Sequence, residues 1–121
     1  MLYETCFLAR ELINWNKQTN NGKTENIDFK RLIFKTNDPA PPFDVYFKPD
    51  PNHVNVDYLQ SMLVNKQEGH NYNIFERYRA LFTLRELNSK DSVIAICQSL
   101  TKENMDTCSA LLKHEVAYVL A

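Results

Sequence analysis

The sequence predicts an all-α protein, an incomplete α-solenoid of stacked helical hairpins interrupted by a long irregular linker. Three observations lead to this prediction. Apolar residues recur at helical spacing along much of the chain, and two helical segments resemble each other at an offset of 36 residues. The 121 residues include only two glycines, fewer than the turns of an all-β chain would need.

The composition and the net charge of the chain argue against some classes of function. Hydrophobic residues make up 44% of the chain, enough for a folded core, and the net charge of -1 gives no electrostatic footprint for nucleic acid. No apolar run approaches the roughly 18 residues of a membrane span, and no signal-peptide pattern follows Met1. We therefore expect a cytoplasmic protein that binds neither nucleic acid nor a membrane.

The first helix is expected to run to about Lys17. Leu2, Cys6, Ala9 and Ile13 recur at the spacing of one helix face. No capping residue precedes this helix, so we expect Met1 to be an arbitrary start and residues 1–17 to be the last helix of an N-terminal repeat half.

Residues 18–54 are expected to form a linker rich in proline and asparagine. Asn20-Asn21-Gly22-Lys23 is polar, and Asp38-Pro39-Ala40-Pro41-Pro42 restricts the backbone to extended conformations. The aromatic residues of the linker are expected to pack on a helical surface, although a short strand remains possible. They are Phe43, Tyr46 and Phe47.

Residues 55–121 are expected to begin a C-terminal repeat half. A helix is predicted over residues 56–65, followed by one that starts after Asn73, a capping residue with Glu76 as its partner three positions later. Ser89 can cap the next helix. The buried stripe predicted for that helix consists of Val93, Ile94, Cys97 and Leu100. The last helix begins near Cys108 and is still in progress at Ala121.

The three cysteines are expected to be small buried core residues. They are Cys6, Cys97 and Cys108. Their odd number and the lack of a Cys-x-x-Cys pair argue against a disulfide framework and a zinc knuckle.

The repeat aligns residues 75–84 with residues 111–120, so that His114-Glu115 takes the place of Tyr78-Arg79. By itself such a pair can be a solvated charge pair on a helix. Its apolar flanks place it at or beside the packed face, and imidazole and carboxylate are ligands for iron, manganese and zinc. Adjacent helical residues diverge by about 100°, so the two are badly placed to bind one ion together.

Other candidate metal sites have weaker support in the sequence. A His-Glu-x-x-His zinc motif would need a histidine where Tyr118 stands. The remaining histidines, His53 and His70, lie in expected loops and are read as exposed loop residues rather than ligands.

Several segments together resemble the deoxyhypusine hydroxylase family. Residues 109–120 are similar to a His-Glu repeat of its C-terminal half, residues 75–85 to the repeat that opens that half, and residues 38–42 to the linker between its halves. Glu4-Thr5-Cys6, with Leu8-Ala9 and Trp15, resembles the last helix of its N-terminal half. The order of these segments agrees over nearly the whole chain.

This resemblance implies HEAT-like hairpin repeats in two halves, with four His-Glu pairs that hold a non-haem di-iron centre, two Fe²⁺ per complete enzyme. The family uses dioxygen to hydroxylate the deoxyhypusine side chain of a translation initiation factor, which completes hypusine biosynthesis. His114 and Glu115 would be iron ligands, one to each iron, and no other catalytic or cofactor-binding residue is carried over.

The chain also departs from the family pattern. The other three pairs are absent, residues 16–37 carry extra asparagine-rich sequence, and the family continues the last helix with Gly-Gln where this chain has Ala121. We therefore expect a fragment that lacks the remainder of its own chain, binds iron weakly and does not turn over alone. Two other readings stay open: a non-catalytic HEAT-repeat scaffold for protein interaction and the related bilin-attaching lyases. The Leu-Lys-His-Glu-Val-Ala-Tyr context favours the enzyme.

Overall fold

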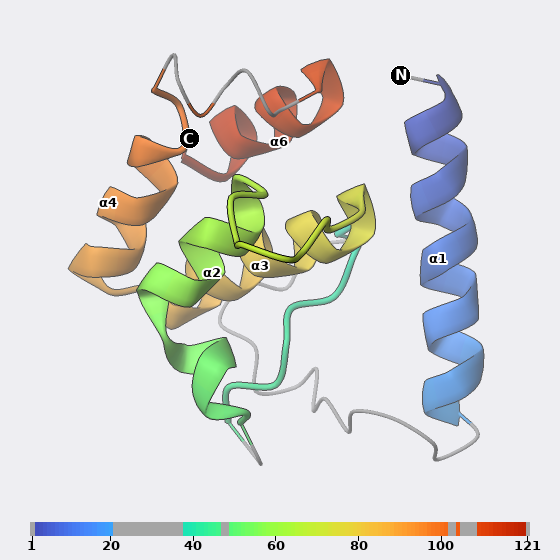
Figure 1. The fold of residues 1–121 in the computed structure, drawn as a ribbon. Helices are drawn as coiled ribbons and strands as arrows, with labels where there is room; N and C mark the ends of the chain where they lie inside the picture. The colour runs from blue at the N-terminus through green and yellow to red at the C-terminus, as the bar shows by residue number, and fades with distance from the viewer. Residues whose placement is uncertain (1, 21–37, 47–48, 102–103, 105–108, 121) are drawn as a thin grey trace.

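The computed structural model describes residues 2–20, 38–46, 49–101, 104 and 109–120, and all regular structure within them is helical. The elements are α1 (Leu2–Asn20), the 3-10 helix η2 (Pro51–Val54), α2 (Val56–Leu63), α3 (Ile74–Leu87), α4 (Lys90–Gln98) and α6 (Ala110–Leu120). Helices α2, α3, α4 and α6 form one packed group, and α1 stands to one side of it and contacts α3 (Figure 1). This arrangement confirms the all-α prediction.

Helix α3 is the centre of the fold because nearly all of its side chains are buried. Its apolar residues Tyr78, Leu81, Phe82 and Leu84 are fully covered. The same helix buries three arginines and a glutamate, which a helix can do only if each charge has partners. The buried charged residues are Arg77, Arg79, Arg85 and Glu86.

The buried charges of α3 fasten the irregular segments to the core. The Nε of Arg77 donates to the Leu63 carbonyl at 2.8 Å, and the Nε of Arg79 donates to the Pro41 carbonyl at 3.0 Å. Arg85 pairs with Asp38. Arg79 and Arg85 thus hold the proline-rich segment, and Arg77 holds the C-terminal end of α2. Because buried charges and apolar side chains occur together around α3, the helix has no simple amphipathic pattern.

Residues 38–46 pack on α3, as predicted for the aromatic part of the linker. Phe43 is buried, and its backbone N–H donates to the Thr83 hydroxyl at 2.8 Å. The Tyr46 hydroxyl donates to Glu86 at 2.6 Å. Phe47 lies outside the described residues, and the segment that is described contains no strand. The division of the chain at residues 17 and 54 stays a prediction.

Helix α1 differs from the prediction in length and in orientation. It continues past Lys17 to Asn20, because Gln18-Thr19-Asn20 contains no proline or glycine to stop it. Its predicted apolar face is largely exposed: Leu2 is 80% and Ile13 54% accessible, whereas Leu8 and Trp15 are buried. Apolar residues occur all around α1, and the side that carries its tryptophan packs against α3.

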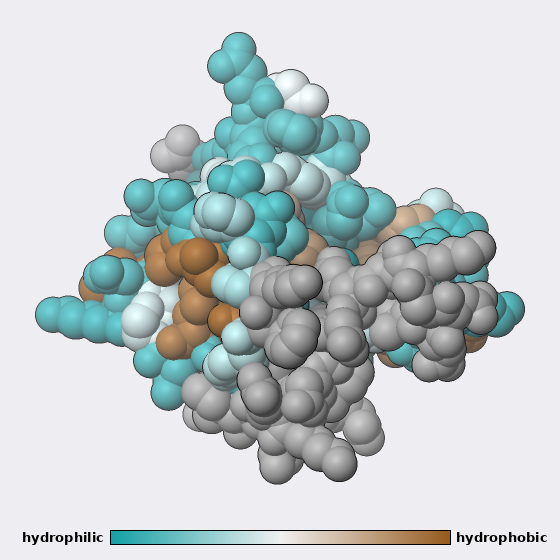
Figure 2. All heavy atoms as spheres, turned by 90° about the horizontal axis from the view of Figure 1, so that it is seen from below, coloured by the Kyte–Doolittle hydropathy of each residue, from teal (hydrophilic) through white to brown (hydrophobic). Residues whose placement is uncertain are grey.

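Helices α2 and α4 end and pack differently from expectation. Helix α2 ends at Leu63 rather than residue 65, with Val64 as its C-cap. Helix α4 turns Val93 and Ile94 toward solvent, so the predicted stripe is wrong. Its buried positions are small or compact, which allows close packing on α2 and α3; they are Ser92, Ala95, Ile96 and Ser99. Apolar atoms accordingly reach the surface on the α2 and α4 side of the underside view (Figure 2).

The cysteine prediction is wrong where it can be examined. Cys6 and Cys97 are both exposed free thiols, because they lie on the faces of α1 and α4 that turn away from the core. Cys108 lies outside the described residues.

The capping signals and the repeat spacing match the structure. Asn73 and Glu76 form the predicted capping box at the start of α3, and Ser89 caps α4. Helix α6 begins 36 residues after α3, the offset of the sequence repeat. The Ser109 hydroxyl accepts the Leu112 N–H at 3.3 Å and so caps α6.

Candidate metal site

His114 and Glu115 lie in the middle of α6; His114 is on the side away from the anchoring residues, and Glu115 is at the edge of the buried face. Leu112 and Val116 are the fully buried residues among the described part of this helix. His114 is exposed and Glu115 is half-buried. Since the two are consecutive on a helix, their side chains diverge by about 100°, and the structure brings no third histidine, cysteine or acid among the described residues into a metal-holding group with them.

The carboxyl group of Glu115 lies within electrostatic reach of the side chains of His114, Asp38 and Arg85. Burial raises its pKa; His114 and Arg85 act in the opposite direction, and Asp38 adds to the rise. A partly buried carboxylate of this kind is stabilised by a cation beside it. The imidazole of His114 and this carboxylate are donor types that iron accepts. The donor types of the pair are therefore compatible with one part of a metal site, which would need further ligands in addition to these two.

Tyr78 joins this region to the core, and sequence reasoning did not single it out. Its ring is fully buried in α3, and its hydroxyl donates to the Leu111 carbonyl in the first turn of α6 at 3.1 Å. Burial raises the pKa of Tyr78, and the carboxylates of Glu115 and Glu4 add to that rise. The available signal was the repeat itself, which aligns Tyr78 with His114.

The remaining histidines take no part in this region. His53 lies in η2, where its ring stacks on Phe43 with centroids 3.8 Å apart. This stacking leaves it half-buried rather than exposed as expected. His70 is exposed and stacks on Tyr72. These histidines do not join His114 in a metal-holding group within the described chain.

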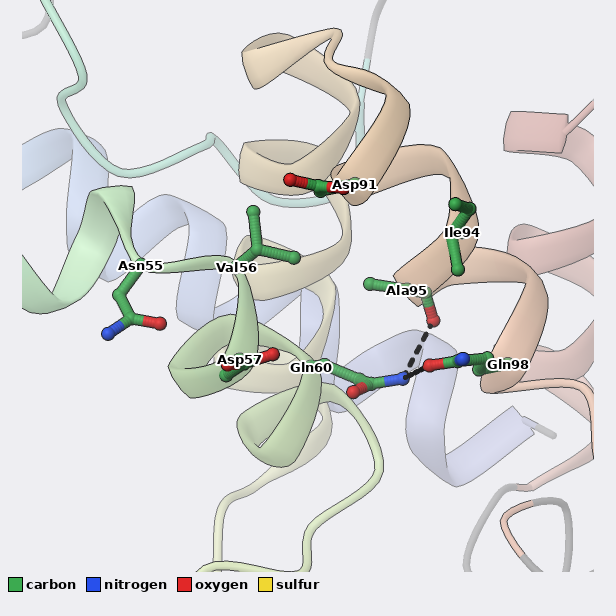
Figure 3. A pocket seen from close by; sticks show the side chains of 8 residues that line it. All are labelled: Asn55, Val56, Asp57, Gln60, Asp91, Ile94, Ala95 and Gln98. Carbon is green, nitrogen blue, oxygen red and sulfur yellow. Dashed lines mark hydrogen bonds between the residues drawn. The ribbon is translucent and has the colours of Figure 1, made fainter.

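A surface groove of about 450 Å³ lies between α2 and α4. Figure 3 shows Gln60 crossing it, with Nε2 donating to the Ala95 carbonyl at 3.3 Å and to the Gln98 Oε1 at 2.9 Å. Asp57 and Asp91 also line it, together with Ile94. Neither His114 nor Glu115 lines this groove, so it is not part of the candidate metal site.

No helix in the described part of the chain is long and apolar enough to cross a membrane. No protein-family model matches the sequence.

Curated relatives and a solved structure resemble the chain over almost its whole length. A deoxyhypusine hydroxylase of Debaryomyces hansenii is 37% identical over 116 residues, covering 96% of this chain and 32% of the relative. One from Dictyostelium discoideum is 38% identical, covering 97% and 31%. The structure of human deoxyhypusine hydroxylase in complex with glycerol aligns with a TM-score of 0.62 at 30% identity, covering 96% of this chain and 32% of the human one.

These matches confirm the resemblance and the helical-repeat fold drawn from the sequence. The chain spans about a third of the length of the relatives it matches. In sequence and in fold, this chain is similar to the deoxyhypusine hydroxylases over that third of their length.

Proposed function

We propose that the chain is part of a deoxyhypusine hydroxylase and supplies one His-Glu ligand pair, His114 and Glu115, to a non-haem di-iron centre. The observation that supports this most is the placement of the pair on α6, within a fold shared with the human enzyme. When bound, the two irons would supply the activation of dioxygen for hydroxylating a deoxyhypusine side chain. The substrate would be a translation initiation factor that bears this residue, and the location would be the cytoplasm.

The geometry of α6 suits ligands that serve two ions. Because consecutive helical side chains diverge by about 100°, His114 and Glu115 point to different positions, and each would bind a different iron. Leu112 and Val116 hold the side of the helix opposite His114 in the core, and Glu115 lies at the edge of that buried side. Asp38 and Arg85 lie close enough to shift the pKa of Glu115: Asp38 raises it and Arg85 lowers it.

Two ligand side chains cannot complete a di-iron site. We infer that this segment alone binds iron weakly and does not turn over, and that the other three pairs come from the remainder of a longer polypeptide. The 31–32% coverage of the relatives is in keeping with this inference.

The test is iron content and hydroxylation in the full-length protein that carries this chain. We expect His114→Ala and Glu115→Ala each to lower bound iron per protein and to abolish the gain of one oxygen atom by a deoxyhypusine-bearing factor, measured by mass spectrometry. The matched control is His70→Ala, because His70 is exposed and its ring contact is with Tyr72. Unchanged iron in both ligand variants would remove the pair from the site.

A non-catalytic scaffold is the second candidate. The groove between α2 and α4, together with exposed Val93 and Ile94, offers a surface for a protein partner. A full-length protein that binds no iron and leaves the deoxyhypusine-bearing factor unmodified would favour this reading over the enzyme.

A further inference from the structure

A hydrogen bond connects the core directly to the helix turn that precedes the His-Glu pair. The Tyr78 hydroxyl donates to the Leu111 carbonyl at 3.1 Å. In an α-helix the carbonyl of residue 111 is also the acceptor for the N–H of residue 115. The hydroxyl of Tyr78 therefore shares an acceptor with the backbone of Glu115.

Tyr78 is held rigidly enough to act as a fixed point. Its side chain is fully buried, and its ring meets that of Phe82 edge-on, with centroids 6.0 Å apart and planes at 79°. Neighbouring Arg77 and Arg79 tie the same stretch of α3 to the Leu63 and Pro41 carbonyls. The hydroxyl is thus fixed in position by contacts on several sides.

Apolar packing holds α6 to the core, but this packing is not directional. Leu112 and Val116 are fully buried, and Leu111, Val119 and Leu120 pack partly buried against the same core. Such contacts resist lifting of the helix, but they define its axial position and rotation less well than a directional hydrogen bond does. A slip by one residue would move α6 by about 1.5 Å and rotate its side chains by about 100°.

We propose that Tyr78 is a positioning residue that sets the register of α6 and thereby the directions of His114 and Glu115. Its consequence for iron rests on the function proposed above, whereas its effect on α6 does not.

The test compares Tyr78→Phe with Tyr58→Phe in the full-length protein. The first substitution removes only the hydroxyl that reaches α6. The second substitution removes the partly buried hydroxyl of Tyr58 in α2. That hydroxyl forms a hydrogen bond with the Tyr72 hydroxyl at 3.4 Å and does not contact α6. Two readouts are made on each: amide hydrogen exchange over residues 110–120 in the metal-free protein, and the affinity for Fe²⁺ under anaerobic conditions.

In Tyr78→Phe we expect exchange in α6 to rise about fivefold, the effect of one lost hydrogen bond. We expect the Fe²⁺ affinity to fall about tenfold, as is typical when a group that orients a ligand is removed. Tyr58→Phe should leave both readouts at their wild-type values, which separates positioning from general destabilisation.

Unchanged exchange in α6 overturns the proposal, and so does faster exchange with unchanged Fe²⁺ affinity in a protein that binds iron. If the wild-type protein binds no iron, the proposed function fails. The exchange result then still decides whether Tyr78 holds α6 in place.

Discussion

Arg85 and Asp38, 47 residues apart in the sequence, are joined by two hydrogen bonds in a nearly buried ion pair. Nη1 donates to Oδ1 at 3.1 Å and Nη2 to Oδ2 at 2.6 Å, with side chains only 7% and 11% exposed. The pair fastens the start of the proline-rich segment to the central helix. Removal of one partner leaves the other charge nearly buried without these two hydrogen bonds.

We therefore expect Asp38→Asn to lower the free energy of unfolding by about 3 kcal/mol, measured by urea unfolding followed by circular dichroism. The control is Glu11→Gln, which breaks the exposed Arg10–Glu11 pair at 3.3 Å and should change stability by less than about 0.5 kcal/mol. Equal effects of the two substitutions would contradict a special role for the buried pair.

The capping box at the start of α3 gives a second prediction. The Asn73 side chain accepts the Glu76 N–H at 2.9 Å, and Glu76 accepts the Asn73 N–H at 3.2 Å. Asn73→Ala should cost about 1 kcal/mol of stability, while Asn73→Asp, which keeps the acceptor, should cost much less. The urea midpoint of each variant measures its stability, provided that the m-value is unchanged. If both variants had the wild-type midpoint, the cap would be dispensable.

Local signals of this kind were the part of the structure that the sequence predicted well. The caps Asn73 and Ser89 depend on chemistry within a few residues, and the 36-residue offset between α3 and α6 depends on a repeat visible in the chain. Both are local or periodic features, so one sequence suffices to find them.

The faces of α1 and α4 were not predictable in the same way. Both helices have apolar residues on more than one side, and tertiary packing chose the side with Trp15 in α1 and the compact side with Ala95 in α4. Hydrophobic periodicity identifies a helix more reliably than it identifies the buried side when apolar residues surround the axis.

The candidate site was predictable only in part. His114 and Glu115 could be proposed from their residue types and their place in the repeat. Their surroundings could not, because Asp38 approaches from the proline-rich segment and Tyr78 and Arg85 approach from α3, and such long-range contacts depend on tertiary packing.

Alkaline pH should weaken the contact between Tyr46 and Glu86. Burial and the hydrogen bond to Glu86 raise the pKa of Tyr46 from 10.0 to about 12. Between these values the unfolded chain has lost the phenolic proton while the folded chain retains it, so the free energy of unfolding falls as pH rises. The contribution is complete below pH 10 and lost above about pH 12.

Tyr46→Phe should make this alkaline decline less steep, as measured by chemical unfolding at several pH values. Tyr72 also has a raised pKa of about 12 and contributes a slope of the same sign. Because Tyr72 is present in both proteins, the difference between them isolates Tyr46. Parallel curves would mean that the Tyr46–Glu86 contact does not form in solution.

The attachment of α1 to the core gives the last prediction. The guanidinium carbon of Arg79 lies 4.1 Å from the centroid of the Phe43 ring and 5.7 Å from that of Trp15, while its Nε donates to the Pro41 carbonyl. One side chain thus connects α3, the proline-rich segment and α1. A desolvated cation–π contact contributes up to about 2 kcal/mol, and a hydrogen bond from a charged donor about 1.5–3 kcal/mol.

Arg79→Ala should therefore cost about 3 kcal/mol and release α1. The expected signature is a red shift of the Trp15 emission, because the only tryptophan in the sequence is 7% exposed when α1 is docked. Arg79→Lys should show a smaller shift, since lysine keeps the charge but not the planar group or Nε. Arg10→Ala, which removes an exposed contact with the Phe7 ring at 5.0 Å, is the matched control and should leave the emission unchanged. An Arg79→Ala spectrum identical to the control would mean that α1 is held to α3 without this contact.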